Sequence, residues 1–466
     1  MKTNGVNPGR LAALIRNCAS GLGVAGLLIV APVTVVSKGP DFSAKPPARP
    51  AHPLALSAQT VSLAQLPGLR AAVQRTISHA QLGQGTSQKN GSGVALTSLG
   101  GKSFWNETHA DSGLPGPEQG YAVAISGNTA VVSAPGFSNS TGTGWLYRHT
   151  GSLWKKVATL PDPRDMANDQ YGWSVAISNT KAGIYVAFGG KATNGQLNNV
   201  YVYQALGPTW SLQATITDPG GDTGDTFGNA VAISSTTLVV GGYCDTENVG
   251  AVYIFHHSGS SWIQQAKLED PAGNPGDNYG NAVAVSGTTA LVGAVDAAYV
   301  YTNQAGQGWA KTATLENPGT SADNFGESVA LAGTTAVIGA PGNPPGSSTL
   351  LPGAAYVYTA SGSTWKQQQE VTYPAGTKGD IFGYSLAMSS TTMLIGMPVY
   401  GAVGCGTAYV YKSSGATWTE QARQADPDCQ NGDDFGFSVA LAGAYGIYGA
   451  PCINSDQGAM YTLKLP

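Results

Sequence analysis

The first residues that could do chemistry are aspartates that recur at one position along the chain. An aspartate stands two residues before each of six aromatic-Gly pairs: Asp169, Asp225, Asp277, Asp323, Asp380 and Asp433. A row of carboxylates could bind a metal or transfer protons. A position filled once per repeat serves every repeat equally, however, whereas an active site singles out one place. Since an aspartate before a turn usually accepts a backbone N–H, we interpret this row as architectural.

Other catalytic patterns are absent from the sequence. It contains no Gly-x-Ser-x-Gly nucleophile elbow, and the six histidines show no metal-ligand spacing. The outer tryptophans, which recur once per repeat, are expected to pack between structural units rather than to bind a ligand. We therefore expect a protein that is not an enzyme and has no catalytic residues.

The aromatic-Gly pairs mark an internal repeat. Counting a first copy at Gln119-Gly120, their glycines are separated by 52, 56, 52, 46, 57 and 53 residues. Each copy reads as four short strands with alternating apolar residues, separated by Gly- and Ser-rich turns, which leaves no room for crossover helices. A four-stranded unit repeated seven times is typical of a β-propeller. The fold class is therefore all-β, a seven-bladed β-propeller.

The two ends of the repeat region complement each other. The last copy stops at Pro466 without the Trp-containing strand that ends the other copies, and a matching strand around Trp105 precedes the first copy. An N-terminal strand that completes the last blade would close the propeller and remove an open sheet edge.

The repeated string resembles a known family. The pattern aromatic-Gly-x-Ser/Ala-Val-Ala followed by Gly-Ala-Pro, as in residues 323–342, resembles the FG-GAP repeat of integrin α-subunit propellers, and it is most similar to the secreted bacterial form. Integrin-type repeats imply calcium, held by aspartates in the loop between the first two strands. The equivalent turns here lack carboxylates: SGNT at 126–129, SSTT at 234–237, SGTT at 286–289, AGTT at 332–335 and SSTT at 389–392. We therefore expect neither a metal nor another cofactor.

The N-terminal region predicts export. Residues 1–37 place basic residues before a 19-residue apolar run and read as a signal peptide or a signal anchor. Residues 38–100 form a Pro-, Ala-, Ser- and Gly-rich linker with room for a short helix, and residues 101–466 hold the propeller. The expected location is extracellular or at the cell surface, with membrane attachment only through an uncleaved N-terminal segment.

Charge limits the range of partners. Of the net charge of −4, residues 1–49 supply +5, from six Lys/Arg and one Asp, so the remaining 417 residues carry −9. A mildly acidic surface offers no electrostatic basis for binding nucleic acid. We expect a monomer that binds an extracellular protein or a glycan. The alternative is an extracellular enzyme, acting on polysaccharide or as another hydrolase or lyase, with its site over the central channel.

The loops that vary among copies are the expected binding surface. The loops between strands 2 and 3 should lie on the same face of the propeller as the loops that enter strand 1. Copy four has only a two-residue loop between strands 2 and 3, while its neighbours have longer ones. This difference predicts a notch in the rim of that face. Surface loops that vary without any function would show the same variation in a single sequence. The predicted binding residues are Tyr243, Asp245, Glu247, Asp296, Leu350 and Leu351.

Cysteines on that face could form a disulfide, which export would permit. Cys429 in the loop entering copy seven and Cys452 in the strand 2–3 loop of the same copy form the first candidate pair. Cys405 with Cys429 is the second. Cys244, about three blades away, would be left unpaired or bonded elsewhere.

The lack of carboxylates in the turns gives a testable prediction about metal. Because no strand 1–2 turn offers the six to eight oxygens that calcium requires, EDTA should leave the melting temperature of the full-length protein unchanged. Thermal unfolding with EDTA, and again with added calcium, measures this. A fall of several degrees that calcium reverses would contradict the expectation.

Overall fold

A computed structural model describes the propeller region of the chain. The described residues are 105–108, 118–151, 153–181, 183–193, 195–221, 226–243, 249–271, 273, 276–304, 307–319, 323–342, 353–373, 381–398, 404–426, 432–452 and 458–465. The predicted signal segment and linker lie outside them. Within the described part, no helix is long and apolar enough to cross a membrane.

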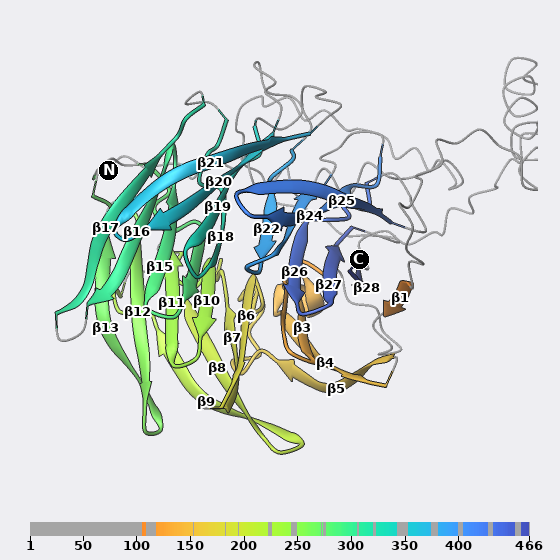
Figure 1. Ribbon diagram of the computed structural model, residues 1–466. Coiled ribbons are helices and arrows are strands. Elements are labelled where there is room, and N and C mark those ends of the chain that lie inside the picture. The colour runs from red at the N-terminus through yellow and green to blue at the C-terminus, as the bar shows by residue number, and fades with distance from the viewer. Residues whose placement is uncertain are drawn as a thin grey trace, which may run out of the picture. The chain divides into compact units, whose positions relative to one another are not determined.

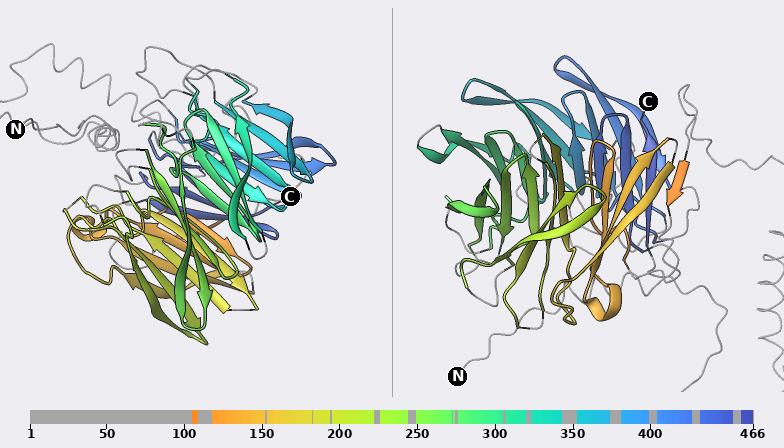
Figure 2. Two further views of the ribbon diagram at one scale, coloured as in Figure 1. Left: turned by 90° about the vertical axis from the view of Figure 1, so that its left-hand side faces the viewer. Right: turned by 90° about the horizontal axis from the view of Figure 1, so that it is seen from below.

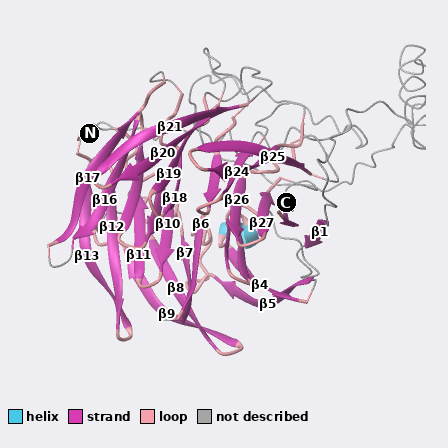
Figure 3. Ribbon diagram, viewed as in Figure 1, coloured by secondary structure: helices cyan, strands magenta, loops and turns pink. Residues whose placement is uncertain are grey.

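Seven four-stranded antiparallel sheets make up the fold and stand side by side around an axis (Figure 1). Figure 3 shows that the described chain is almost entirely strand, with one short helical segment, α3 (Phe137–Ser140). The seven-bladed all-β propeller predicted from the repeat is therefore confirmed.

The first six blades each take four consecutive strands. Blade 1 holds β2 (Val123–Ser126), β3 (Thr129–Ala134), β4 (Thr143–Thr150) and β5 (Leu153–Pro161); blade 2 holds β6 (Ser174–Thr180), β7 (Gly183–Gly189), β8 (Asn199–Leu206) and β9 (Thr209–Thr217); blade 3 holds β10 (Ala230–Ser234), β11 (Thr237–Gly242), β12 (Ala251–Ser258) and β13 (Ser261–Glu269). Blade 4 holds β14 (Val283–Ser286), β15 (Thr289–Ala294), β16 (Ala297–Gln304) and β17 (Gly308–Glu316); blade 5 holds β18 (Ser328–Ala332), β19 (Thr335–Ala340), β20 (Ala354–Ser361) and β21 (Thr364–Thr372); blade 6 holds β22 (Ser385–Met388), β23 (Thr392–Met397), β24 (Thr407–Ser414) and β25 (Thr417–Ala425).

Blade 7 is built from both ends of the repeat region. Its inner strands are β26 (Ser438–Ala442), β27 (Tyr445–Ala450) and β28 (Ala459–Lys464), and its outer strand is β1 (Trp105–Thr108). β1 pairs antiparallel with β28, with Trp105 opposite Leu463. In Figure 2 the orange β1 lies beside the blue C-terminal strands. The predicted closing strand is therefore present.

The hydrophobic core lies between neighbouring blades. The second and third strands of the blades are almost wholly buried, since both faces of each are covered by the adjacent sheets. One core cluster, for example, joins Val239 and Ile254 of blade 3 to Val292 and Tyr299 of blade 4. Burial of these side chains, each contributing roughly 1.5–3 kcal/mol, makes each blade depend on its neighbours.

Glycines set the distance between blades. The glycine of each aromatic-Gly pair has a φ between 86° and 95°, which disfavours any residue with a Cβ. A Cβ on Gly339 in the second strand of blade 5 would collide with the carbonyl oxygen of Gly383 in blade 6. The same approach recurs at five other interfaces: Gly189 with Gly228, Gly241 with Gly280, Gly293 with Gly326, Gly396 with Gly436, and Gly449 with Gly120. The repeated motif thus supplies the close backbone contact between neighbouring blades.

Closure by β1 predicts unequal effects of two deletions. Removing residues 101–110 from the full-length protein exposes the edge of β28 and should lower the melting temperature much more than removing residues 38–90, because the first deletion removes β1 and its pairing with β28. Circular dichroism during heating measures both variants. Equal melting temperatures would contradict this role of β1.

The close approach of glycines predicts a steric effect at Gly339. Gly339→Ala should destabilise the protein by about 2–3 kcal/mol, because the added methyl group meets a backbone carbonyl that cannot move aside. Gly362→Ala, in the outer hairpin of the same blade, meets no atom within 4 Å and carries only the strain of its φ of 64°, about 1–2 kcal/mol. Denaturant unfolding compares the two, and a smaller loss at Gly339 would refute the steric explanation.

Candidate functional site

One position within the repeat differs from copy to copy and faces a shared location. It is the residue directly after each aromatic-Gly pair, where the innermost strand of the blade begins. We call these seven residues the axial ring: Tyr121, Trp173, Asn229, Asn281, Glu327, Tyr384 and Phe437. Because the innermost strands surround the axis, the ring lies at one end of it.

The same turn holds every member of the axial ring. The backbone N–H of each donates to the carbonyl of the residue three positions earlier, at 2.9–3.2 Å. The glycine before it occupies the third place of a four-residue turn, where type II turns require a positive φ. For Trp173, the partner is the carbonyl of Gln170, 3.1 Å away. The seven side chains thus leave equivalent backbones and differ only in chemistry.

Four consecutive blades supply an aromatic arc. The ring centroids of Tyr384 and Phe437 are 5.2 Å apart, those of Phe437 and Tyr121 are 5.0 Å apart, and those of Tyr121 and Trp173 are 4.7 Å apart. These tilted contacts fall within the preferred range for aromatic pairs. Tyr121, Trp173 and Tyr384 remain half-buried, while Phe437 is 9% exposed. The arc is therefore a connected aromatic surface, three of whose members are accessible.

The three remaining blades supply a polar arc. The Trp173 indole Nε1 donates to Asn229 Oδ1 at 3.1 Å, and Asn229 Nδ2 donates to Asn281 Oδ1 at 3.3 Å. Asn281 Nδ2 in turn donates to the backbone carbonyl of Glu327 at 3.5 Å, and Glu327 is exposed. The axial ring therefore has an aromatic side and an amide–carboxylate side, connected from Tyr384 through Phe437 and Trp173 to Glu327.

A lysine lies over the junction of the aromatic arc with the adjacent loops. Lys191 Nζ is 4.3 Å from the ring centroid of Trp173 and 5.5 Å from that of Tyr243, both within cation–π range. The backbone N–H of Lys191 donates to the carbonyl of Asp169 at 3.2 Å. Lys191 thus adds one positive charge beside the axial ring.

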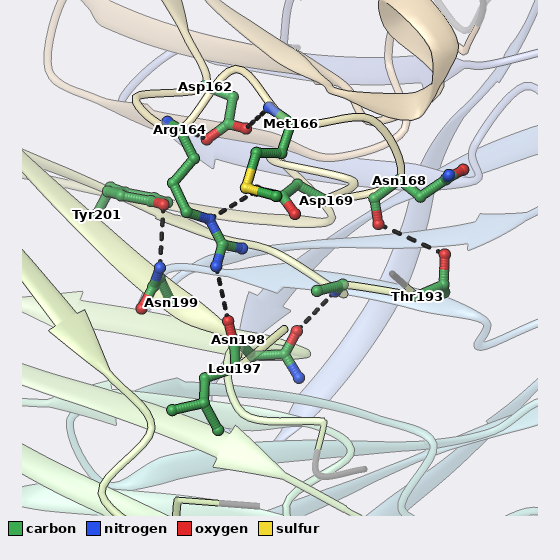
Figure 4. A network of polar contacts seen from close by, with 11 residues as sticks. Asp162, Arg164, Met166, Asn168, Asp169, Thr193, Leu197, Asn198, Asn199 and Tyr201 are labelled. Atoms are coloured by element: carbon green, nitrogen blue, oxygen red, sulfur yellow. Dashed lines mark hydrogen bonds and ion pairs between the residues drawn. The ribbon is translucent and has the colours of Figure 1, made fainter. Parts of the chain in front are cut away.

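The network in Figure 4 fixes the loop that carries Lys191. Arg164 forms an ion pair with buried Asp169, at 2.6 Å between Nε and Oδ2, and donates to the carbonyl of Leu197 at 2.9 Å. Asp162 accepts from the backbone N–H groups of Arg164 and Met166. Burial raises the pKa of Asp162 to about 6, and the neighbouring Asp169 adds to the rise although the two N–H donors oppose it. These contacts hold two loops of blades 1 and 2 together.

A pocket opens beside the polar arc, between blades 4 and 5. Its lining includes Asn281 and Glu327 of the axial ring, with Asn278 and Asn324 from the two preceding turns and Val295 from the two-residue loop. Three asparagines and one glutamate make half of its eight lining residues polar. The pocket therefore lies at the short loop where the sequence predicts a notch.

The predicted binding residues fall partly within the described chain. Tyr243 lies beside Lys191 and hence close to Trp173. Asp296 follows the pocket residue Val295, and its Oδ1 accepts from Asn317 Nδ2 at 3.0 Å, which gives it a structural contact. Asp245, Glu247, Leu350 and Leu351 lie outside the described residues, so their binding role stays a prediction.

The recurring aspartates make local contacts where they are described. Asp323 Oδ1 accepts from the backbone N–H of Phe325 at 3.1 Å, the expected turn contact. Asp169 instead pairs with Arg164. Across the described ranges, no group of three or more His, Cys, Asp or Glu side chains could hold a metal ion. Asp225 and Asp380 lie outside those ranges.

Two of the cysteines predicted to share this face are oxidised. Cys405 and Cys452 are both disulfide-bonded. Cys405 lies next to the loop that enters blade 7, since its carbonyl accepts from the backbone N–H of Phe435 at 2.7 Å, and Cys452 Sγ is 3.5 Å from Asp434 Oδ2 in that loop. Both predicted pairings involve Cys429, which is outside the described residues. Since Cys429 can bond only one of the two, each pairing stays a prediction.

The axial ring is not among the residues predicted from the sequence. Its signal is present in the repeat, because the residue after the aromatic-Gly pair changes from aromatic to amide to acid while glycine precedes it and serine or alanine follows it in every copy. Variation at one position of a repeated motif is less conspicuous than variation in loop length.

One family model and one solved structure are similar to parts of this chain. A model of the FG-GAP repeat matches residues 210–255, 262–308, 309–358 and 365–411. The crystal structure of the GH74 xyloglucanase from Xanthomonas campestris is similar over 74% of this chain and 52% of that chain, with 13% identity and a TM-score of 0.46, so this chain spans about half the length of that enzyme. No match was found among curated proteins. Four FG-GAP repeats are thus matched in a chain that folds as a seven-bladed β-propeller.

Proposed function

We propose that this propeller is an exported, non-catalytic binding protein that takes its ligand on the face of the axial ring. The observation that carries the proposal is the asymmetry of that ring. The seven positions share one backbone geometry, yet aromatic side chains fill one side and Asn229, Asn281 and Glu327 the other. A surface with distinct apolar and polar sides at one end of the axis suits a specific ligand.

The loops around the ring support the same face. Tyr243 and Lys191 extend the aromatic side outward, and the pocket at Val295 extends the polar side. The long loop of residues 343–352 follows β19 of blade 5, which borders the pocket through Glu327. We propose that these loops add contacts to a ligand centred on the axial ring.

Export is supported by the N-terminal sequence and by the cysteines. The basic and then apolar order of residues 1–37 is that of a signal peptide or signal anchor. The disulfide-bonded Cys405 and Cys452 suit an oxidising compartment. A cell-surface or secreted location would present the axial ring to extracellular proteins or glycans.

An extracellular polysaccharide-acting enzyme is the alternative, and the ring favours it less. Glycoside hydrolysis usually requires two carboxyl groups on opposite sides of the scissile bond. Glu327 is the single acid among the seven ring residues. Asp296, the nearest acid on the adjoining loop, accepts from Asn317. This composition suits recognition better than turnover.

A binding experiment with matched variants tests the proposed function. Full-length protein is applied to an array of extracellular proteins and glycans, alongside Trp173→Ala and a variant with residues 343–352 replaced by a Gly-Ser turn. Both changes should abolish the binding of the captured probe and leave the melting temperature nearly unchanged, since Trp173 belongs to neither of the core clusters that blade 2 forms with its neighbours.

The control is Trp309→Ala, which removes a half-buried tryptophan on the outer strand of blade 4. It should bind as the unchanged protein does. If Trp173→Ala and the loop variant retain binding while changes on the opposite face remove it, the assignment to this face is wrong. Release of reducing ends from a bound polysaccharide would favour the enzyme.

A further inference from the structure

We infer that the ligand of the axial ring is an uncharged saccharide. This inference rests on the proposed function and names the chemical class that the same site would take. Three features of the ring and its surroundings carry it: the form of the aromatic arc, the hydrogen-bonding capacity of the polar arc, and the balance of charge.

The aromatic arc matches the apolar faces of a sugar. A pyranose presents C–H groups on its two faces, and the face of an aromatic side chain carries the negative part of its quadrupole, so C–H groups pack favourably against it. Trp173, Tyr121 and Tyr384 are half-buried members of one continuous arc across blades 6, 7, 1 and 2. Their tilt, 48–50° between neighbouring rings, makes a curved surface rather than a flat slot.

The polar arc matches the hydroxyl groups at the edge of the same sugar. A hydroxyl both donates and accepts, and so does a side-chain amide, while a carboxylate only accepts. Asn229 and Asn281 hold each other in place at 3.3 Å, and exposed Glu327 follows them. The adjoining pocket, with Asn278 and Asn324 in its lining, gives room for a further hydroxyl or a bridging water.

The charges at the axial ring argue for a neutral ligand. Glu327 on the polar side is balanced by Lys191 over Trp173, so the ring has no excess charge of either sign. Nearby Arg164 and Asp169 form an ion pair, so their charges also cancel. Since a polyanion or a cationic peptide would gain from a field of one sign, the ring favours a ligand that carries none.

The asymmetry of the axial ring also predicts how many saccharides one propeller binds. The aromatic arc spans four blades and the polar arc three, so the ring offers one arrangement of apolar and polar groups rather than seven equal sites. A saccharide would lie with a C–H face toward Trp173 and Tyr121 and its hydroxyl edge toward Asn281 and Glu327. We therefore expect one saccharide per propeller.

The test uses full-length protein and isothermal titration calorimetry with cellohexaose, laminarihexaose, xylohexaose and mannohexaose. A hexamer of polygalacturonate and a hexamer of chitosan serve as anionic and cationic comparisons. At least one neutral hexasaccharide should bind with a stoichiometry of one and more tightly than the charged ones. Trp173→Ala and Asn281→Ala should each weaken binding about tenfold or more, as for central contacts of an interface, whereas Trp173→Phe should retain most of it.

A control variant and the melting temperatures distinguish a loss of binding from a loss of folding. Trp309→Ala should bind as the unchanged protein does, and the melting temperature of each variant shows whether it is folded. Failure of every neutral hexasaccharide to bind at millimolar concentration overturns the saccharide class, as does tighter binding of a charged hexamer. If saccharides fail while a captured protein still depends on Trp173, the proposed binding function stands and only the class is wrong. If no array probe depends on the ring either, both are wrong.

Discussion

The close approach of glycines between adjacent blades is the contact on which the rest of the structure depends. In each blade the N–H of the first glycine donates to the carbonyl of the residue at the second glycine position, as Gly326 does to Gly339 at 2.9 Å. Gly339 then faces the carbonyl of Gly383 in the next blade with no room for a methyl group. The first glycine of the motif thus holds two strands of one blade together, and the second glycine allows that blade to contact the next. One exception occurs, at Ser133 in blade 1, which packs 2.8 Å from where a Cβ on Gly172 would lie.

This division of roles explains why repetition and diversity lie side by side in the sequence. The glycine and the aromatic before it meet steric demands that every blade makes, since the aromatic side chains of these pairs, such as Phe325 and Phe382, are fully buried in the cores between blades. The next residue lies just before the innermost strand and contacts its counterparts in the neighbouring blades, outside the core clusters between the sheets. Its chemistry can differ in each blade without cost to the packing of the sheets.

Much of the fold could be predicted from the sequence because it rests on local periodicity. Alternating apolar residues, spaced glycines and the displaced Trp105 were enough to predict seven blades and the closing strand. The axial ring could not be found this way, because only the closed propeller brings Tyr121 and Phe437, 316 positions apart in the chain, to 5.0 Å. The surroundings of His257 in β12, which packs against Tyr185 of the neighbouring blade and against Trp262, likewise depend on the assembled propeller.

The same constraint bears on how the axial ring can bind. Each ring residue follows a glycine with a positive φ and ends a hydrogen-bonded turn that directly precedes the innermost strand of its blade. Its backbone is therefore fixed before any ligand arrives, and its side chain is restrained by neighbours, as Trp173 is by Tyr121, Asn229 and Lys191. Little conformational entropy remains to be lost on binding. A weakly interacting ligand such as a neutral sugar gains most from such a surface, because its contacts are individually small and cannot offset a large ordering cost.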